Sequence, residues 1–504
     1  MSTAENRNAV QEFKALQRKI RAYEHALTLM EYDSLTHMPP GGAEARGDAS
    51  AELYGTLHRL TSGAETKALL QEVLAEPESL DPLTRKEAET MQEELERLEK
   101  VPEELITALE KAKNDGNHFW RIAKEQDDYG IFRPYLQKLL DLSLEYAAAA
   151  GPDRDPYDVF LDKFEKGLSQ EILDPFFREL RAEIVPLLTA VRESGTVIED
   201  GFTHLRYEIP KQKQLSEAVM EIMGVDRTRC TLDETEHPFT LDFGRSDVRI
   251  TTKYIEDDML NNLFSVIHES GHAQYELHVD EELNHSILGH GSTTAIHETQ
   301  SRMWENGIAR SRAFSAELLE EIRKLFPEQV RGVDAEQFYR AINAVTPDLI
   351  RTQADELTYS LHIMVRYELE KKLFHGELTL EELPAEWNRL YEEYLGVKVP
   401  NDAAGVLQDA HWAGGAFGYF PGYALGNAYA AQILRVVSQS VDLDECARTR
   451  DFSPLMDLMT EKMYRYGKGL GSEEILLSVT GEPFRPQYYT DYLKEKFGEI
   501  YGIS

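Results

Sequence analysis

Apolar residues recur every three to four positions along most of this chain, which is the spacing of an amphipathic α-helix. Asp81 followed by Pro82 marks one helix start, because Asp caps helix N-termini and Pro fits the first turn. The pattern predicts helices at residues 10–32, 82–100, 102–113, 129–150, 156–166, 170–193, 211–223, 255–278, 292–313, 316–325, 335–344, 349–373, 380–395, 427–437, 452–464 and 486–497.

One segment departs from the helical pattern. Within residues 231–254, Pro238 and Gly244 interrupt the chain, and apolar and polar residues alternate in 239–243 and 248–252. This alternation predicts a short antiparallel pair of strands. We expect one domain over residues 1–504, because no change of composition and no low-complexity linker divides the chain. The predicted fold class is mainly α, with a small antiparallel β-sheet.

Directly after the predicted strands comes His268-Glu269-Ser270-Gly271-His272. On a helix, His268 and His272 are one turn apart on the same face, so that two imidazoles can bind one Zn²⁺. Glu269 is then placed to act on a metal-bound water without binding the metal itself. Two histidines and a glutamate could also be hydrogen-bonded residues of an ordinary buried helix. The apolar flanks favour metal catalysis, because buried polar groups are costly unless they are paired or metal-bound.

A catalytic zinc needs a third protein ligand and one open position. Glu298 is our candidate, since it lies 26 residues after His272, far enough for the chain to return on a second helix. Glu276 would point past the metal from the same helix, and His297 would face about 100° away from Glu298. The spacing alone leaves several alternatives open, namely Glu276, His278, His285, His290, His297 and Glu305.

The net charge of −36 argues against nucleic acid and anionic membranes as partners. The two cysteines, Cys230 and Cys446, exclude a disulfide framework and suit a reducing compartment. No apolar run reaches the roughly 18–20 residues of a membrane span, and the N-terminus carries no apolar signal sequence. We therefore expect a cytoplasmic protein without a membrane or nucleic-acid partner.

Six segments, in order, resemble the carboxypeptidase Taq family of metallocarboxypeptidases. They are His237-Pro238-Phe239, Asp247-Val248-Arg249-Ile250-Thr251, His268-Glu269-Ser270-Gly271-His272, His297-Glu298-Thr299-Gln300, Ile350-Arg351-Thr352-Gln353-Ala354-Asp355 and Gly405-Val406-Leu407-Gln408-Asp409-Ala410-His411-Trp412. Thr299 stands where the family often has Ser, which changes none of the expected roles.

The resemblance implies that His268, His272 and Glu298 bind the metal and that Glu269 is the catalytic carboxylate. It implies a metal that is zinc, or sometimes cobalt, and a homodimer. It also implies a helical body around a deep substrate groove, similar to that of neurolysin-like oligopeptidases. We expect residues 1–205 or thereabouts to form one wall of this groove and residues 206–504 to carry the metal site.

A carboxypeptidase must bind a free terminal carboxylate, and the guanidinium fork of arginine suits both oxygens. Arg351 and Arg249 are the candidates; we favour Arg351 as the anchor and Arg249 for the closed end of the groove. The glycine-rich segment 405–426 predicts a loop that closes over bound peptide. Tyr423 follows His411 by 12 residues, similar to a neurolysin-type segment, so we expect Tyr423 to stabilise the oxyanion with help from His411.

These expectations predict release of single amino acids from the free C-terminus of peptides, with broad side-chain specificity. The rival functions are an endo-acting oligopeptidase on the same scaffold and a binding protein with a structural metal.

His237 is expected to add a hydrogen bond to substrate. The residue that orients the ligands stays open between Glu305 and Asp355, and Gln408 and Asp409 are further candidates for such support.

Overall fold

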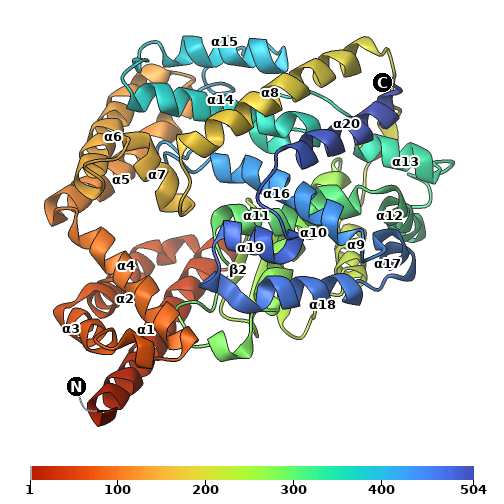
Figure 1. Ribbon diagram of the computed structural model, residues 1–504. Helices are drawn as coiled ribbons and strands as arrows, with labels where there is room; N and C mark the ends of the chain where they lie inside the picture. The colour runs from red at the N-terminus through yellow and green to blue at the C-terminus, as the bar shows by residue number, and fades with distance from the viewer. Residues whose placement is uncertain (1–2, 504) are drawn as a thin grey trace.

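The computed structural model describes residues 3–503 and shows a mainly helical protein with one small sheet (Figure 1). The first four helices are α1 (Thr3–Thr36), α2 (Ala43–Ser62), α3 (Ala64–Val73) and α4 (Pro82–Glu99). They share a small core that includes Phe13, Leu70, Val73 and Leu95 and that is separate from the main core. In Figure 1 they form the red and orange group at the lower left.

The main core begins with the next group of helices and continues to the C-terminus. This group comprises α5 (Glu103–Gln126), α6 (Tyr129–Ala150), α7 (Pro156–Phe164), α8 (Gln170–Glu193) and α9 (Ile209–Ile222). After the sheet follow α10 (Met259–Leu277), α11 (Thr294–Arg302), a π-helical segment η5 (Met303–Ala309), α12 (Arg312–Leu325), α13 (Ala335–Ile342), α14 (Glu356–Phe374), α15 (Leu383–Leu395), α16 (Pro421–Val437), α17 (Leu443–Thr449), α18 (Ser453–Lys462), α19 (Ser472–Thr480) and α20 (Gln487–Tyr501).

The sheet contains β1 (Cys230–Glu234), β2 (Thr240–Asp242) and β3 (Val248–Thr252) in the order β1-β3-β2. The predicted antiparallel pair is present as β2 and β3, with Leu241 opposite Arg249. A third strand, β1, runs parallel to β3, so the sheet is mixed. Strand β2 is an edge strand, and its outer edge is not paired with another strand among residues 3–503.

The fold class is confirmed as mainly α with a small sheet beside the helix of the His-Glu-x-x-His segment. The division into walls near residue 205 and the groove between them stay predictions. Helix α16 begins at Pro421, inside the segment that we expected to be a loop, because Pro favours the first turn of a helix. No helix within residues 3–503 is long and apolar enough to cross a membrane.

Helix α11 is packed closely between α10 and α16 (Figure 1). A Cβ on Gly271 of α10 would lie 2.8 Å from the carbonyl oxygen of Gln300 and 2.8 Å from Cα of Ser301. A Cβ on Gly426 of α16 would lie 2.7 Å from Cγ of Glu298. Real Cβ atoms do not approach other atoms this closely, so both positions require glycine. The two glycines thereby set the distance of α11 from its neighbours.

We predict that Gly271→Ala lowers the free energy of unfolding by about 1–3 kcal/mol, because the added methyl group meets rigid backbone. Gly47→Ala on α2 is the matched control, since a Cβ there has no atom within 4 Å. Alanine at that exposed helical position should instead raise stability by about 0.5–1 kcal/mol. Thermal unfolding of both variants checks the two signs, and a Gly271→Ala protein as stable as wild type would contradict the packing argument.

Candidate active site

Helix α10, which carries His268, Glu269 and His272, is buried on most of its surface. Its first turn is capped by Asp258, whose carboxylate accepts a hydrogen bond from the backbone N–H of Asn261 (3.2 Å). The helix packs against β3, α9 and α11. His268 and His272 face Glu298 of α11, and Glu269 faces Thr240 of β2.

Helix α11 brings Glu298 to the two histidines. The Nε2 atoms of His268 and His272 each lie 3.8 Å from Oε2 of Glu298. The two imidazole centroids are 5.0 Å apart, and one donor atom from each of the three residues lies within 4.8 Å of the others. Two imidazoles and one carboxylate from two helices are the donor set of a three-ligand zinc site with an open position.

Glu305 supports His268 from the π-helical segment η5. Its Oε2 lies 2.9 Å from Nδ1 of His268, which leaves Nε2 of that ring directed toward Glu298. Burial acts to raise the pKa of Glu305, but Arg302, His268 and Arg310 together hold it well below its usual range. Glu305 is therefore a carboxylate that can accept the Nδ1 proton and fix the tautomer of a metal-binding imidazole.

Asp355, the alternative orienting residue, is placed elsewhere. Its carboxylate accepts hydrogen bonds from the backbone N–H groups of Thr358 (2.9 Å) and Thr346 (3.0 Å), so it caps α14. The sequence spacing carried a usable signal for Glu305. It lies seven residues after Glu298, about two helical turns, and therefore on the same face.

His272 is supported by a second chain of hydrogen bonds that the sequence analysis missed. Nδ1 of His272 lies 3.0 Å from Nδ1 of His297, and Nε2 of His297 lies 2.5 Å from Oε1 of Glu276. In neutral His297 an Nε2–H that donates to Glu276 leaves Nδ1 as an acceptor for the Nδ1–H of His272. This assignment leaves the Nε2 lone pair of His272 free for a metal ion. Glu276 and His297 therefore support His272, a candidate ligand, although the sequence offered them only as rival ligands.

Arg302 connects the carboxylates of the cluster. Its Nε donates to Oε1 of Glu298 (2.6 Å) and its Nη1 donates to Oε2 of Glu305 (3.1 Å). The guanidinium also lies 4.4 Å from the centroid of the Tyr359 ring. Because the buried carboxylates would otherwise repel one another, Arg302 both neutralises and positions them.

The side chain of Glu269 extends from α10 toward the edge strand β2. Its Oε2 accepts a hydrogen bond from Oγ1 of Thr240 (2.6 Å), and its side chain is buried. Burial raises the pKa of Glu269. A carboxylate with a raised pKa beside a metal-ligand cluster is suited to exchange protons during a reaction. Thr240 had not been identified from the sequence, because its contact depends on how β2 packs against α10.

Arg351 is held by a buried network on the other side of the site. Its Nε and Nη2 donate to Oδ1 of Asp409 (3.1 and 3.0 Å), and its Nη1 donates to the hydroxyl of Tyr359 (3.0 Å). Three of the five guanidinium N–H groups are thereby engaged, which leaves two for a ligand. The guanidinium lies 5.1 Å from the ring of Tyr423. Arg351 and Tyr423, two of the predicted site residues, are thus neighbours.

Tyr423 and His411 belong to the same aromatic cluster. Their ring centroids are 6.3 Å apart, and Tyr419 lies 5.4 Å from Tyr423. Burial raises the pKa of Tyr423 well above its usual value, so its hydroxyl keeps the proton that an oxyanion donor needs. Burial also lowers the pKa of His411 to about 4, so this imidazole is neutral at pH 7.

Arg249 and His237 lie outside the ligand cluster. Arg249 on β3 forms two hydrogen bonds to Asp247 (2.9 and 2.8 Å), and its guanidinium lies 5.0 Å from the ring of Tyr32 on α1. His237 is exposed in the bend between β1 and β2. Among the described residues neither side chain forms a hydrogen bond or ion pair with His268, His272 or Glu298.

Comparison with known proteins gives matches over nearly the whole chain. The family model described as "Carboxypeptidase Taq (M32) metallopeptidase" matches residues 12–497. Carboxypeptidase 1 of Bacillus subtilis (strain 168) is 37% identical over 495 residues, which cover 97% of this chain and 98% of that protein. Thermostable carboxypeptidase 1 of Thermus thermophilus is 35% identical over 506 residues, which cover 98% and 99%. The crystal structure of the M32 carboxypeptidase from Deinococcus radiodurans R1 superimposes with a TM-score of 0.95 at 35% identity and covers 98% and 100%.

The resemblance inferred from the six sequence segments is therefore confirmed over nearly the whole chain. Membership of a metallopeptidase family implies a divalent metal, and the donor set of His268, His272 and Glu298 fits one. The chain belongs to the carboxypeptidase Taq (M32) family of metallopeptidases and is a peptide hydrolase of the carboxypeptidase type.

Proposed function

We propose that this carboxypeptidase depends on one divalent metal ion per chain and releases one residue at a time from peptides with a free C-terminus. The convergence of His268, His272 and Glu298, with Glu269 next to them, is the observation that carries the proposal. Zn²⁺ is the most suitable ion for two imidazoles and one carboxylate, and Co²⁺ is an acceptable substitute. The bound ion would polarise the peptide carbonyl and acidify the attacking water.

The side chains around the ligands would handle the protons and the charge. Glu269 would accept a proton from the attacking water and pass it to the leaving amine. The hydroxyl of Tyr423 would donate a hydrogen bond to the developing oxyanion, and His411 would help to position that hydroxyl. Thr240 would hold the carboxylate of Glu269 in place through its hydrogen bond.

Arg351 would bind the terminal carboxylate of the substrate with its two remaining N–H groups. Its other N–H groups are fixed by Asp409 and Tyr359, so the guanidinium is held in one orientation. Arg249 would shape the closed end of the groove, and His237 would contribute a hydrogen bond at the periphery. Broad side-chain specificity follows if the enzyme recognises the carboxylate and the peptide backbone rather than the side chain.

The assembly and location remain proposals as well. We propose a homodimer on the strength of the family resemblance, and a cytoplasmic location. Both cysteines, Cys230 and Cys446, are free and buried, which suits a reducing compartment.

We predict that Glu269→Gln lowers kcat/KM by about 10²–10⁴-fold, because it removes the proton acceptor but keeps the shape of the side chain. The metal content should remain at one ion per chain, since Glu269 is not a proposed ligand. Hydrolysis rates on a peptide with a free C-terminus and elemental analysis of the dialysed protein check both parts. Hydrolysis by wild type that survives removal of the metal with a chelator would refute the proposed metal dependence.

We predict that Tyr423→Phe lowers kcat by about 10²–10³-fold with little change in KM, because the lost hydrogen bond forms mainly in the transition state. Tyr419→Phe is the matched control, since it removes a neighbouring hydroxyl from the same aromatic cluster. Steady-state kinetics of both variants check this assignment. An equal loss in the two variants would show that Tyr423 has no special part in the reaction.

We predict that wild type cleaves a peptide with a free C-terminus and leaves the C-terminally amidated form intact, because amidation removes the charge that Arg351 binds. Arg351→Lys keeps the positive charge beside Asp409 but loses the fork, so it should raise KM about tenfold or more for the free peptide. Mass spectrometry of both digests checks the cleavage end. Internal cleavage of the amidated peptide would instead identify an oligopeptidase.

A further inference from the structure

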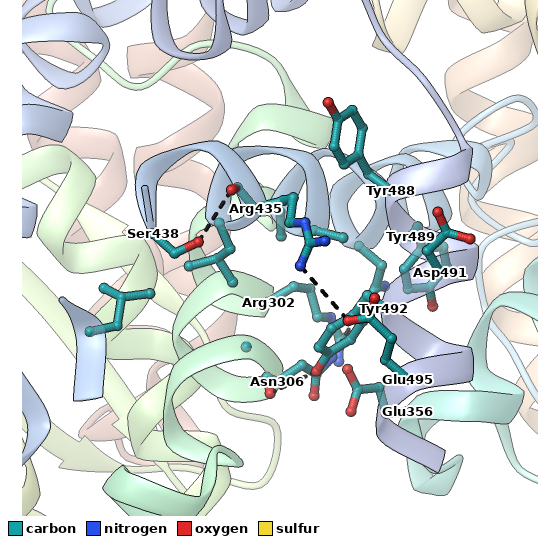
Figure 2. Close-up of a pocket in the computed structure, with 16 residues that line it drawn as sticks. Arg302, Asn306, Glu356, Arg435, Ser438, Tyr488, Tyr489, Asp491, Tyr492 and Glu495 are labelled. Carbon is teal, nitrogen blue, oxygen red and sulfur yellow. Dashed lines mark hydrogen bonds and ion pairs between the residues drawn. The ribbon is translucent and has the colours of Figure 1, made fainter. Parts of the chain in front are cut away.

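A cavity of about 310 Å³ lies between α16, α20 and the end of α11 with its continuation η5 (Figure 2). None of the proposed metal ligands lines it, and neither do Glu269, Tyr423 or Arg351. Its volume is at the lower end of the roughly 300–1,000 Å³ that is typical of small-molecule sites. The cavity is therefore separate from the candidate active site and large enough for a small metabolite.

The inner part of the cavity has both polar and apolar walls. Asn306, Asn427 and Glu356 lie at the polar part and are nearly fully buried. Glu356 is already neutralised by an ion pair with Lys496 (2.6 Å). The apolar part is formed by small and aliphatic side chains, among them Ala430, Ala431, Leu434 and Leu443. Entry of an apolar ligand side chain into this part would be favourable, because apolar surface is removed from water.

Opposite charges lie at the outer part of the cavity. Nη1 of Arg435 on α16 and Oε2 of Glu495 on α20 are 3.8 Å apart, and their side chains are 63% and 67% exposed. Asp491, also on the lining, has no ion pair among the described residues and is exposed. An exposed pair at this distance contributes little to stability, so both groups are available to a ligand. Figure 2 shows the Arg435 and Glu495 side chains extending toward each other from α16 and α20.

We propose that this cavity binds a free α-amino acid. The carboxylate of the ligand would pair with Arg435, its ammonium group would pair with Glu495 and Asp491, and its side chain would enter the apolar part. A simple anion is disfavoured by the two carboxylates at the same place, and a simple cation by Arg435. The zwitterion satisfies both charges at once, and the apolar wall favours an amino acid with an aliphatic or thioether side chain.

The cavity shares residues with the support of the candidate active site. Asn427 accepts a hydrogen bond from Nδ2 of Asn306 (3.1 Å) and donates one from its own Nδ2 to the carbonyl oxygen of Tyr423 (3.0 Å). Arg302, another lining residue, binds the carboxylate of Glu298. A ligand that contacts Asn427 or Arg302 therefore acts on groups that position the proposed oxyanion donor and a proposed metal ligand.

This arrangement suggests feedback by the released product, a regulatory role that rests on the proposed release of free amino acids. The binding itself does not depend on that function. Binding and hydrolysis can therefore be tested separately, and each can fail without the other.

The location of the ligand is tested with L-selenomethionine, which is a zwitterion of suitable size with an anomalously scattering atom. Crystals of the metal-loaded enzyme are soaked with this amino acid, and anomalous difference maps locate the selenium. We expect a peak between α16 and α20, with or without a second peak beside the metal ligands. Selenium only beside the metal ligands, or no peak at millimolar concentrations, would overturn the proposal.

The recognition of the two charges is tested by calorimetric titration with L-methionine. Arg435→Gln and Glu495→Gln should each weaken binding to the cavity by about tenfold or more, the loss expected for a charge-assisted hydrogen bond. Both side chains are exposed, so neither change should prevent folding. Arg97→Gln is the matched control, because Arg97 is an exposed arginine paired with Glu94 on α4 and does not line the cavity.

Arg351→Lys separates cavity binding from product binding at the proposed active site, and it should leave the affinity of the cavity unchanged. If Arg435→Gln and Glu495→Gln bound L-methionine as tightly as the control variant and Arg351→Lys, that result would refute the cavity as the binding site. In wild type, added L-methionine should change the rate of peptide hydrolysis, and Arg435→Gln should abolish that change. An enzyme that binds L-methionine in the cavity but hydrolyses no peptide would refute the proposed function and leave the binding site intact.

Discussion

The close packing of α11 against both α10 and α16 is the constraint on which the rest of the site depends. Glycines at 271 and 426 allow the helices to approach until a Cβ at either position would meet rigid atoms of α11. At this separation the carboxylate of Glu298 reaches the two imidazoles of α10. A larger side chain at either glycine would move the carboxylate of Glu298 away, so the proposed metal site depends on backbone packing as much as on its donor residues.

The burial of several carboxylates requires compensation within the same cluster. Arg302 binds both Glu298 and Glu305, and Arg310 lies 3.4 Å from Glu305. His268 and His272 each obtain a hydrogen-bond partner for Nδ1, which leaves Nε2 toward the third donor. A buried charge without partners would be strongly destabilising, so the network supports the fold while it orients the donors. The continuation of α11 into a π-helix at Met303–Ala309 carries Glu305 within reach of His268.

Another buried carboxylate holds the glycine-rich loop that carries His411. Glu370 on α14 accepts hydrogen bonds from Nε1 of Trp412 (2.6 Å), the backbone N–H of Gly418 (2.8 Å) and the hydroxyl of Tyr157 (2.9 Å). Burial raises its pKa to about 7 in spite of these three donors. The loop is thereby attached to the main core, and it leads directly into α16 with Tyr423 in the first turn. The proposed oxyanion donor is positioned by α16 itself rather than by a free loop.

The sequence by itself determined the helical class, the β2–β3 pair, the His268–His272 spacing and the family, because helical periodicity and short motifs are local properties. It also determined that Glu298 was a candidate for the third ligand, without deciding among its rivals. Only the tertiary structure decided that Glu305, rather than Asp355, contacts His268 and that His297 and Glu276 support His272. It also revealed the contact of Thr240 with Glu269 and the parallel strand β1. These contacts join residues from different elements, and their formation depends on how helices and strands pack, which no local pattern of residues encodes.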